Sequence, residues 1–206
     1  MEKRKHYKRT ALFAFSLLLG LFLVCILWVR KEQRQYSLNR QLISALFHEN
    51  GKQALRLVEA GADPNTRYTP APAPSLSNLA NFLLHRSTPT TNNSPTALMM
   101  ACGSNRFPNE HGEGAIKLFP FADSQVVQAM LLRGADVNAT GFGGWTALHD
   151  AVNYQENKFI IKQLLDYGAD PTLETNDGQT PIAIATHVER PDLITFIRQY
   201  SKPPDR

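Results

Sequence analysis

Apolar residues in the last two thirds of the chain recur with the spacing of short amphipathic helices. The apolar positions of 126–131 fall at i, i+1, i+4 and i+5, which places them on one face of a helix. The segment 159–165 repeats this pattern with one polar position, Gln163. A short helix with a single apolar face cannot bury that face alone, so the pattern predicts helices that stack against neighbouring helices.

Two short phrases recur together with these helices. One is Gly-Ala-Asp directly after an apolar run, and the other is Thr followed by a small residue or proline and then by mostly apolar residues. Between the last two units both phrases step by 34 residues, a period that predicts tandem supersecondary units. The glycines are Gly61, Gly134 and Gly168, and the threonines are Thr96, Thr146 and Thr180.

Each phrase has the chemistry of a helix boundary. Thr180 offers a capping hydroxyl, and Pro181 follows at the first helical position, where its missing N–H costs little. A glycine just after an apolar run, such as Gly168, fits the left-handed conformation that often ends a helix. The phrases therefore predict two short helices of opposite direction in each unit.

These paired phrases resemble the signature of ankyrin repeats, with its Thr-Pro-Leu-His-x-Ala opening and its Leu-Leu-x-x-Gly-Ala-Asp-x-Asn close. The resemblance implies an all-α ankyrin-repeat solenoid of about four helix–turn–helix units. It also implies that His149 hydrogen-bonds to Thr146 in a structural role. We expect a repeat domain over 38–200 and a tail at 201–206, with units at about 38–67, 94–140, 144–173 and 178–200.

Two insertions interrupt the period, at about 67–93 and 103–122. The first lies in the loop that joins units one and two, and the second lies between the two helices of unit two. Long loops in compact repeats are either functional or disordered. Both insertions contain apolar residues, which favours loops that pack against a partner or against their own repeat stack, and a tolerated surface excursion stays open.

The amino terminus has a different pattern. Residues 1–10 form a basic tail with five Lys or Arg, and the 19 residues of 11–29 carry no charge. A helix of this length spans about 28 Å, close to a hydrocarbon core of roughly 30 Å. We therefore expect a transmembrane signal anchor at 11–29 and a linker at 30–37, with a cleaved signal peptide as the alternative.

The expected location follows from this anchor. The short basic tail favours a cytoplasmic amino terminus and repeats on the other side of the membrane, although the opposite topology stays open. The arrangement resembles small ankyrin proteins of the bacterial envelope. It implies a single-pass protein of the bacterial inner membrane, with the lipid bilayer as partner of 11–29 and periplasmic repeats.

Charge is divided unevenly along the chain. Residues 1–40 carry nine basic and two acidic side chains, whereas residues 41–206 carry thirteen basic and sixteen acidic ones. The repeats therefore have no basic stripe, which argues against nucleic acid as a partner. The two cysteines fit any redox compartment.

No catalytic pattern emerges from the sequence, and we expect no enzyme activity, no cofactor and no small-molecule substrate. The one suggestive cluster is Glu110, His111 and Glu113 in the second insertion. It has no second histidine at metal-binding spacing, so a polar loop tip is the favoured interpretation and a metal-dependent enzyme is a remote alternative.

The resemblance implies a protein-binding function, because ankyrin stacks bind protein partners through their loop tips and inner helices. An alternative is an immunity protein that neutralises a secreted toxic effector such as a phospholipase. Phe142 and Trp145 are expected to be exposed aromatics of a loop tip. The candidate binding residues are Tyr68, Met99, Met100, Phe142, Trp145, Asp150 and Asn153.

Overall fold

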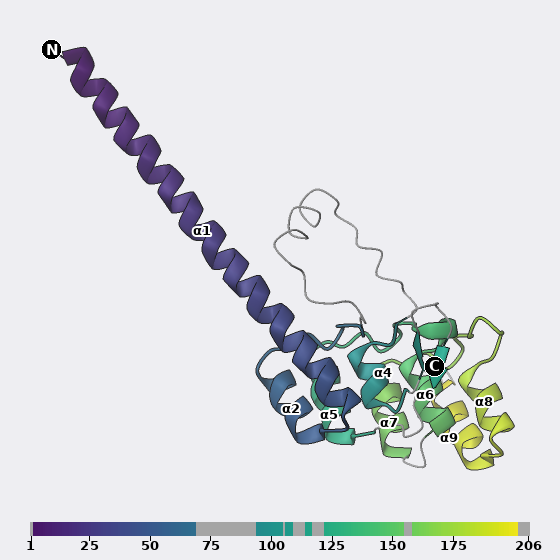
Figure 1. The fold of residues 1–206 in the computed structure, drawn as a ribbon. Helices are drawn as coiled ribbons and strands as arrows, with labels where there is room; N and C mark the ends of the chain where they lie inside the picture. The colour runs from purple at the N-terminus through teal and green to yellow at the C-terminus, as the bar shows by residue number, and fades with distance from the viewer. Residues whose placement is uncertain are drawn as a thin grey trace.

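One long helix leads into a stack of short helices (Figure 1). The structure, a computed structural model, describes the backbone of residues 2–68, 94–104, 106–108, 114–116, 122–154 and 158–201, and the side chains of 19–68, 94–104, 122–154 and 158–200. The helices are α1 (Glu2–Phe47), α2 (Gly51–Glu59), α4 (Ala97–Ala101), α5 (Ser124–Leu132), α6 (Ala147–Tyr154), α7 (Lys158–Asp166), α8 (Pro181–His187) and α9 (Pro191–Ser201), with a 3-10 turn η1 (Phe142–Gly144).

The described helices form four hairpins that stack side by side in two rows. The end of α1, α4, α6 and α8 make an inner row in which each helix contacts the next, and α2, α5 and α7 make an outer row in the same way. Within each unit the inner helix packs on its outer partner, as α8 does on α9. This arrangement agrees with the expected stack of about four helical units.

Local sequence explains where these helices begin and end. The Thr96 hydroxyl accepts a hydrogen bond from the Met99 N–H at 3.2 Å, and the Thr180 hydroxyl accepts one from the Ala183 N–H at 3.2 Å. Residues Gly61, Gly134 and Gly168 have φ angles of 98°, 80° and 87°, the left-handed conformation expected at these helix ends.

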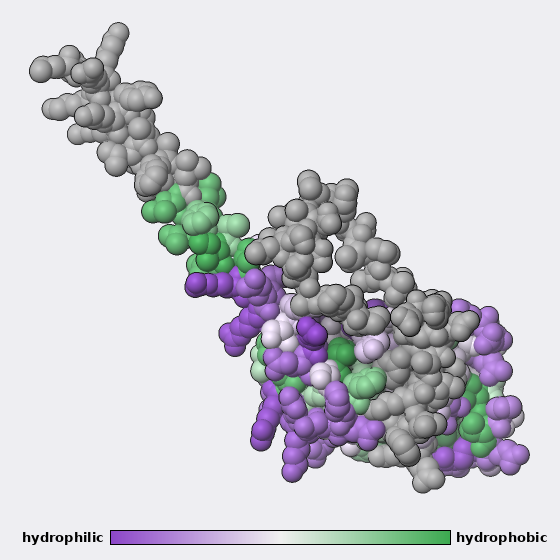
Figure 2. Space-filling view, in the orientation of Figure 1, coloured by the Kyte–Doolittle hydropathy of each residue, from purple (hydrophilic) through white to green (hydrophobic). Residues whose placement is uncertain are grey.

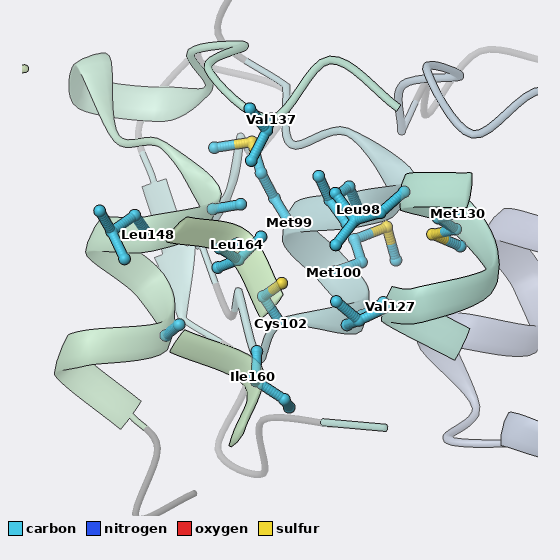
Figure 3. Close-up of a cluster of buried hydrophobic side chains, with 14 of the residues drawn as sticks. Leu98, Met99, Met100, Cys102, Val127, Met130, Val137, Leu148, Ile160 and Leu164 are labelled. Carbon is cyan, nitrogen blue, oxygen red and sulfur yellow. The ribbon is translucent and has the colours of Figure 1, made fainter. Parts of the chain in front are cut away.

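One continuous core runs through the stack. Helix α4 contributes Leu98, Met99 and Met100, each at most 3% exposed. Figure 3 shows these side chains beside those of the neighbouring helices. The partners labelled there are Val127 and Met130 of α5, Leu148 of α6, and Ile160 and Leu164 of α7.

The second insertion adds a feature that the all-α expectation did not include. It contains a short antiparallel hairpin, β1 (Arg106–Pro108) and β2 (Gly114–Ile116). The base of the insertion is closed by a bridge between Cys102 and Ala122. Strands of three residues are too short to produce a period-two pattern, which is why the sequence did not predict them.

Residues 30–37, the expected linker, are helical. Helix α1 runs without interruption through this segment and ends at Phe47 as the inner helix of the first unit. The sequence has neither glycine nor proline between Gly20 and Gly51, so nothing in it breaks the helix.

In the part of the chain that the structure describes, no helix combines the length and the apolar character needed to cross a bilayer. The side chains of α1 are described from Leu19 onward, and Figure 2 shows their exposed apolar band giving way to a hydrophilic one. Any bilayer-length stretch that begins there includes Arg30, Lys31, Glu32 and Arg34.

This finding overturns the expected membrane location. The transmembrane anchor at 11–29, the lipid partner and the single-pass assignment are therefore corrected. The side chains of residues 11–18 lie outside the described part.

Candidate protein-binding surface

The loops that join consecutive units are called fingers here, and they comprise 61–68 with 94–95, 134–146 and 168–180. A side-chain amide holds each of the later two fingers to the preceding one. The Asn65 Nδ2 donates to the Gly134 carbonyl at 3.1 Å, and the Asp136 N–H donates to the Asn65 Oδ1 at 2.6 Å. Asn138 makes the same two contacts with the next turn, at 3.0 and 2.8 Å. The fingers are therefore positioned as a connected row.

The first finger is anchored on both sides of the first insertion. Arg67 and Thr96 form an antiparallel bridge, and the Tyr68 N–H donates to the Pro95 carbonyl at 3.0 Å. The Arg67 guanidinium also donates to the Ser94 carbonyl at 2.7 Å. These contacts fix the backbone from which the Tyr68 side chain projects.

Tyr68 stacks on Phe47, which is the last residue of α1. The ring centroids are 6.2 Å apart and the planes are inclined by 16°. Phe47 is 37% exposed and Tyr68 is half-buried, so the pair lies at the surface. A finger and an inner helix thus meet in an aromatic pair. The sequence analysis named Tyr68 as a candidate binding residue but did not name Phe47.

Trp145 is buried and not the exposed aromatic that was expected. Its side chain is 9% exposed, and its ring lies 5.9 Å from that of His149. The Trp145 carbonyl accepts a hydrogen bond from the Gly141 N–H at 2.7 Å. Trp145 therefore supports the finger from inside, because the tip folds back over it.

His149 and Thr146 form the structural pair that the resemblance implied. The Thr146 N–H donates to the His149 Nδ1 at 3.1 Å, so Nδ1 is the unprotonated nitrogen and Nε2–H donates to the Gln179 carbonyl at 3.1 Å. Burial lowers the pKa of His149 below its usual 6.5, although hydrogen bonds to the Gln179 and Leu173 carbonyls oppose the shift. The neutral imidazole thus links two units.

The expected contact residues of α4 and α6 lie inside the molecule. Met99, Met100 and Asp150 are 1%, 3% and 0% exposed. All residues of 97–104 and 145–152 are buried, although an inner helix normally leaves one side open. Strand β1 of the second insertion contacts the η1 finger, so this insertion crosses from its base on α4 to the finger row.

A buried thiol lies in this covered region. Burial raises the pKa of the Cys102 thiol well above its usual 9.0, and the nearby charge of Asp150 raises it further. A thiol in this environment stays protonated and is a poor nucleophile.

On the inner side of the stack, the residues that stay accessible lie on the inner-row helices and fingers on either side of α4. We call this surface the inner face. Phe142 of η1 and Asn153 of α6 are half-buried there together with Tyr154, and His187 of α8 is exposed. Phe142 is therefore less open than the exposed aromatic that was expected. Its described members include Phe47, Tyr68, Phe142, Asn153, Tyr154 and His187.

The possible metal cluster at Glu110, His111 and Glu113 lies outside the described residues. Among the residues that the structure describes, no group of three or more His, Cys, Asp or Glu side chains is placed to hold a metal ion.

A family model for ankyrin repeats, in three copies, matches residues 115–205. The match begins within the second unit and leaves α1, α2 and α4 outside it. Residues 115–205 are therefore similar to ankyrin repeats, which generally mediate protein–protein interactions.

Similar proteins are much longer than this chain. The 2-5A-dependent ribonuclease of Mus musculus is 38% identical over 94 residues, which cover 45% of this chain and 13% of the ribonuclease. A putative ankyrin repeat protein of Fowlpox virus is 36% identical over 42% of this chain and 27% of its own length. Ankyrin repeat and SAM domain-containing protein 6 of Rattus norvegicus is 37% identical over 40% of this chain and 10% of its own. The chain matches less than a third of each relative.

Proposed function

We propose, from the ankyrin repeats of residues 115–205, that this chain is a protein-binding module that engages its partner through the inner face. The observation that carries the proposal is the Phe47–Tyr68 stack, with ring centroids 6.2 Å apart at the surface. Aromatic side chains held in place before binding are the usual anchors of protein interfaces.

The stack has the properties of such an anchor. Tyr68 is held by its backbone contact to Pro95, and Phe47 stands at the end of a helix whose preceding residues Ala45 and Leu46 are buried. Both rings therefore lose little conformational freedom when a partner covers them. The His48 ring, 5.7 Å from Phe47 in an edge-on arrangement, adds a polar group at the rim.

The burial of Met99, Met100, Trp145 and Asp150 narrows the proposal. These side chains pack beneath the inner face and have almost no exposed surface that a partner could contact. We propose that contact is made by Tyr68, Phe142 and Asn153 together with Phe47.

The test is site-specific photo-cross-linking with the full chain. We would replace Tyr68 by benzoylphenylalanine, and in a matched control replace Tyr167, a tyrosine 44% exposed just after the outer helix α7. A second pair is Phe142 against Phe159 of α7, which is 54% exposed. We expect a discrete protein adduct from Tyr68 and Phe142 and none from the outer positions.

Adducts only from the outer positions, or equally from all four, would refute the inner face as the binding surface. If the cross-linked partner is an enzyme, its activity with and without the purified chain also tests the inhibitor alternative. A partner whose activity is unchanged at saturation would exclude that role.

A further inference from the structure

The turn that closes the first unit is held in the same way as the later turns, but by helix α1. The Gly61 carbonyl accepts a hydrogen bond from the Gln35 Nε2 at 3.0 Å, and the Asp63 N–H donates to the Asn39 Oδ1 at 2.8 Å. These are the two backbone groups that correspond to Gly134 and Asp136 in the next turn. No finger precedes the first unit in the described chain, so α1 takes the place of one.

Two side chains on α1 together do what one asparagine does elsewhere. Gln35 and Asn39 are separated by one helical turn, and the Gln35 Nε2 also donates to the Asn39 Oδ1 at 2.9 Å. The donor of the pair therefore comes from Gln35 and the acceptor from Asn39. Asn65 and Asn138 supply both from a single amide.

We propose that α1 is the amino-terminal cap of the repeat stack, and that the Gln35–Asn39 pair locks it in a fixed direction relative to the inner face. A stack of repeats needs terminal elements that satisfy its open ends. The pair satisfies the polar groups of the first turn, and the apolar residues of the same helix cover the first unit.

The packing of α1 supports this role. Leu42 and Leu46 are at most 1% exposed, and Leu38 packs against the same core from one turn earlier. The polar pair extends this contact to Gln35, so α1 is held to the repeat stack from Gln35 to Leu46, which is about three helical turns. The same helix ends in Phe47, which ties its direction to the aromatic pair of the inner face.

The proposal is independent of the proposed function, because its test needs no partner. In the full chain, nitroxide labels would be placed on the native Cys25, which is exposed on α1, and on a cysteine introduced by Leu132→Cys in α5, where the leucine is 68% exposed. The remaining Cys102 is buried. Pulsed dipolar spectroscopy then measures the distance distribution between α1 and the stack.

We expect one narrow distribution in the parent and a broad one in Gln35→Ala/Asn39→Ala, with a folding equilibrium constant roughly fivefold lower for each hydrogen bond lost. The matched control is Gln41→Ala, which removes a hydrogen bond to Ser37 within α1 and none to the repeats. That control should keep both the narrow distribution and the stability.

A broad distribution in the parent, or a double variant as narrow as the control, would overturn the proposal. If the double variant fails to fold, Gln35→Glu decides the question. Glutamate keeps the shape and helix propensity of glutamine but cannot donate to the Gly61 carbonyl. We expect Gln35→Glu to broaden the distribution, and an unchanged one would refute the role of the pair.

Discussion

The Asn138 side chain binds the turn of the next unit by donating from Nδ2 to the Gly168 carbonyl at 3.0 Å. Its Oδ1 accepts from the Asp170 N–H at 2.8 Å, so a single amide satisfies one acceptor and one donor of the same turn. The Asn138 N–H in turn donates to the Asp136 carboxylate of its own turn at 3.1 Å. In the Asp-x-Asn sequence that ends a unit, the aspartate therefore accepts a hydrogen bond within its own turn, and the asparagine hydrogen-bonds to the backbone of the turn in the next unit.

Replacing Asn138 by alanine should lower the free energy of unfolding by about 1–3 kcal/mol, because both backbone groups of the turn lose their partner. Urea unfolding followed by circular dichroism measures the change. Thr172→Ala is the matched control, since Thr172 has the equivalent place in its turn but, among the described residues, its hydrogen bonds go only to Asp170. An effect of Asn138→Ala no larger than that of the control would contradict the bridging role.

The finger between the third and fourth units (168–180) closely approaches the backbone of the preceding finger (134–146) at Gly144. A Cβ atom there would lie 2.9 Å from the Asn176 backbone nitrogen and 2.6 Å from its Oδ1. The Asn176 N–H donates to the Gly143 carbonyl at 2.8 Å, so the clash would break a contact between the two fingers.

Gly144→Ala should therefore cost more than backbone strain alone. Gly178→Ala is the control, because Gly178 has a similar φ of 72° against 76° and no atom lies within 4 Å of its added Cβ. We expect the free energy of unfolding to fall by about 1 kcal/mol in the control and by at least about 2 kcal/mol in Gly144→Ala. Thermal unfolding measures both changes as shifts of the midpoint. Equal shifts would show that the fingers move apart at little cost.

Helix boundaries were predictable because their causes are local. Thr180 and Pro181 cap α8 as expected, and Gly168 takes the left-handed conformation, since hydroxyl capping and a positive φ depend on adjacent residues only. The continuity of α1 through 30–37 was also readable in principle. The absence of glycine and proline between Gly20 and Gly51 was the available signal.

The surface was less predictable because exposure depends on distant segments. Trp145 stands at a loop tip in the sequence, but the finger folds over it and its ring packs near His149. Met99 and Met100 lie on an inner helix whose open side is covered in the folded chain. Phe47 was overlooked because the first unit lacks the Thr-x-Leu-His opening that marks an inner helix.

His149 should make the protein less stable as the pH falls through about 6.5. Its pKa is lowered by burial from the ordinary 6.5, so below that pH the unfolded chain binds a proton that the folded chain does not. The free energy of unfolding is therefore highest above pH 6.5 and declines toward the lower pKa of the folded state. Urea midpoints between pH 8 and pH 5 measure this slope.

The control for this slope is His149→Gln, which removes the titrating group and should flatten the dependence in that range, whatever its overall stability. Two carboxylates with lowered pKa values titrate outside this window. Hydrogen bonds from Lys162 and Thr172 lower the pKa values of Asp166 and Asp170 below 3.8, so both act only under more acidic conditions. A slope that persists in His149→Gln would assign the effect to another group.

The first insertion should be removable without loss of the repeat stack. Its two ends are joined at the base, because Tyr68 N–H donates to the Pro95 carbonyl at 3.0 Å and the Ala97 N–H donates to the Thr66 carbonyl at 2.8 Å. A Gly-Ser linker in place of residues 69–93 therefore spans a gap that the flanking backbone has already closed.

Deleting 67–93 is the matched control, since it also removes Arg67, whose guanidinium donates to the Ser94 and Thr140 carbonyls. We expect the shorter deletion to keep the helical circular dichroism and the urea midpoint of the parent. The longer one should lower the midpoint, because only the longer deletion removes the Arg67 hydrogen bonds to the Ser94 and Thr140 carbonyls. Loss of helical signal in the shorter deletion would show that the insertion is part of the folded core.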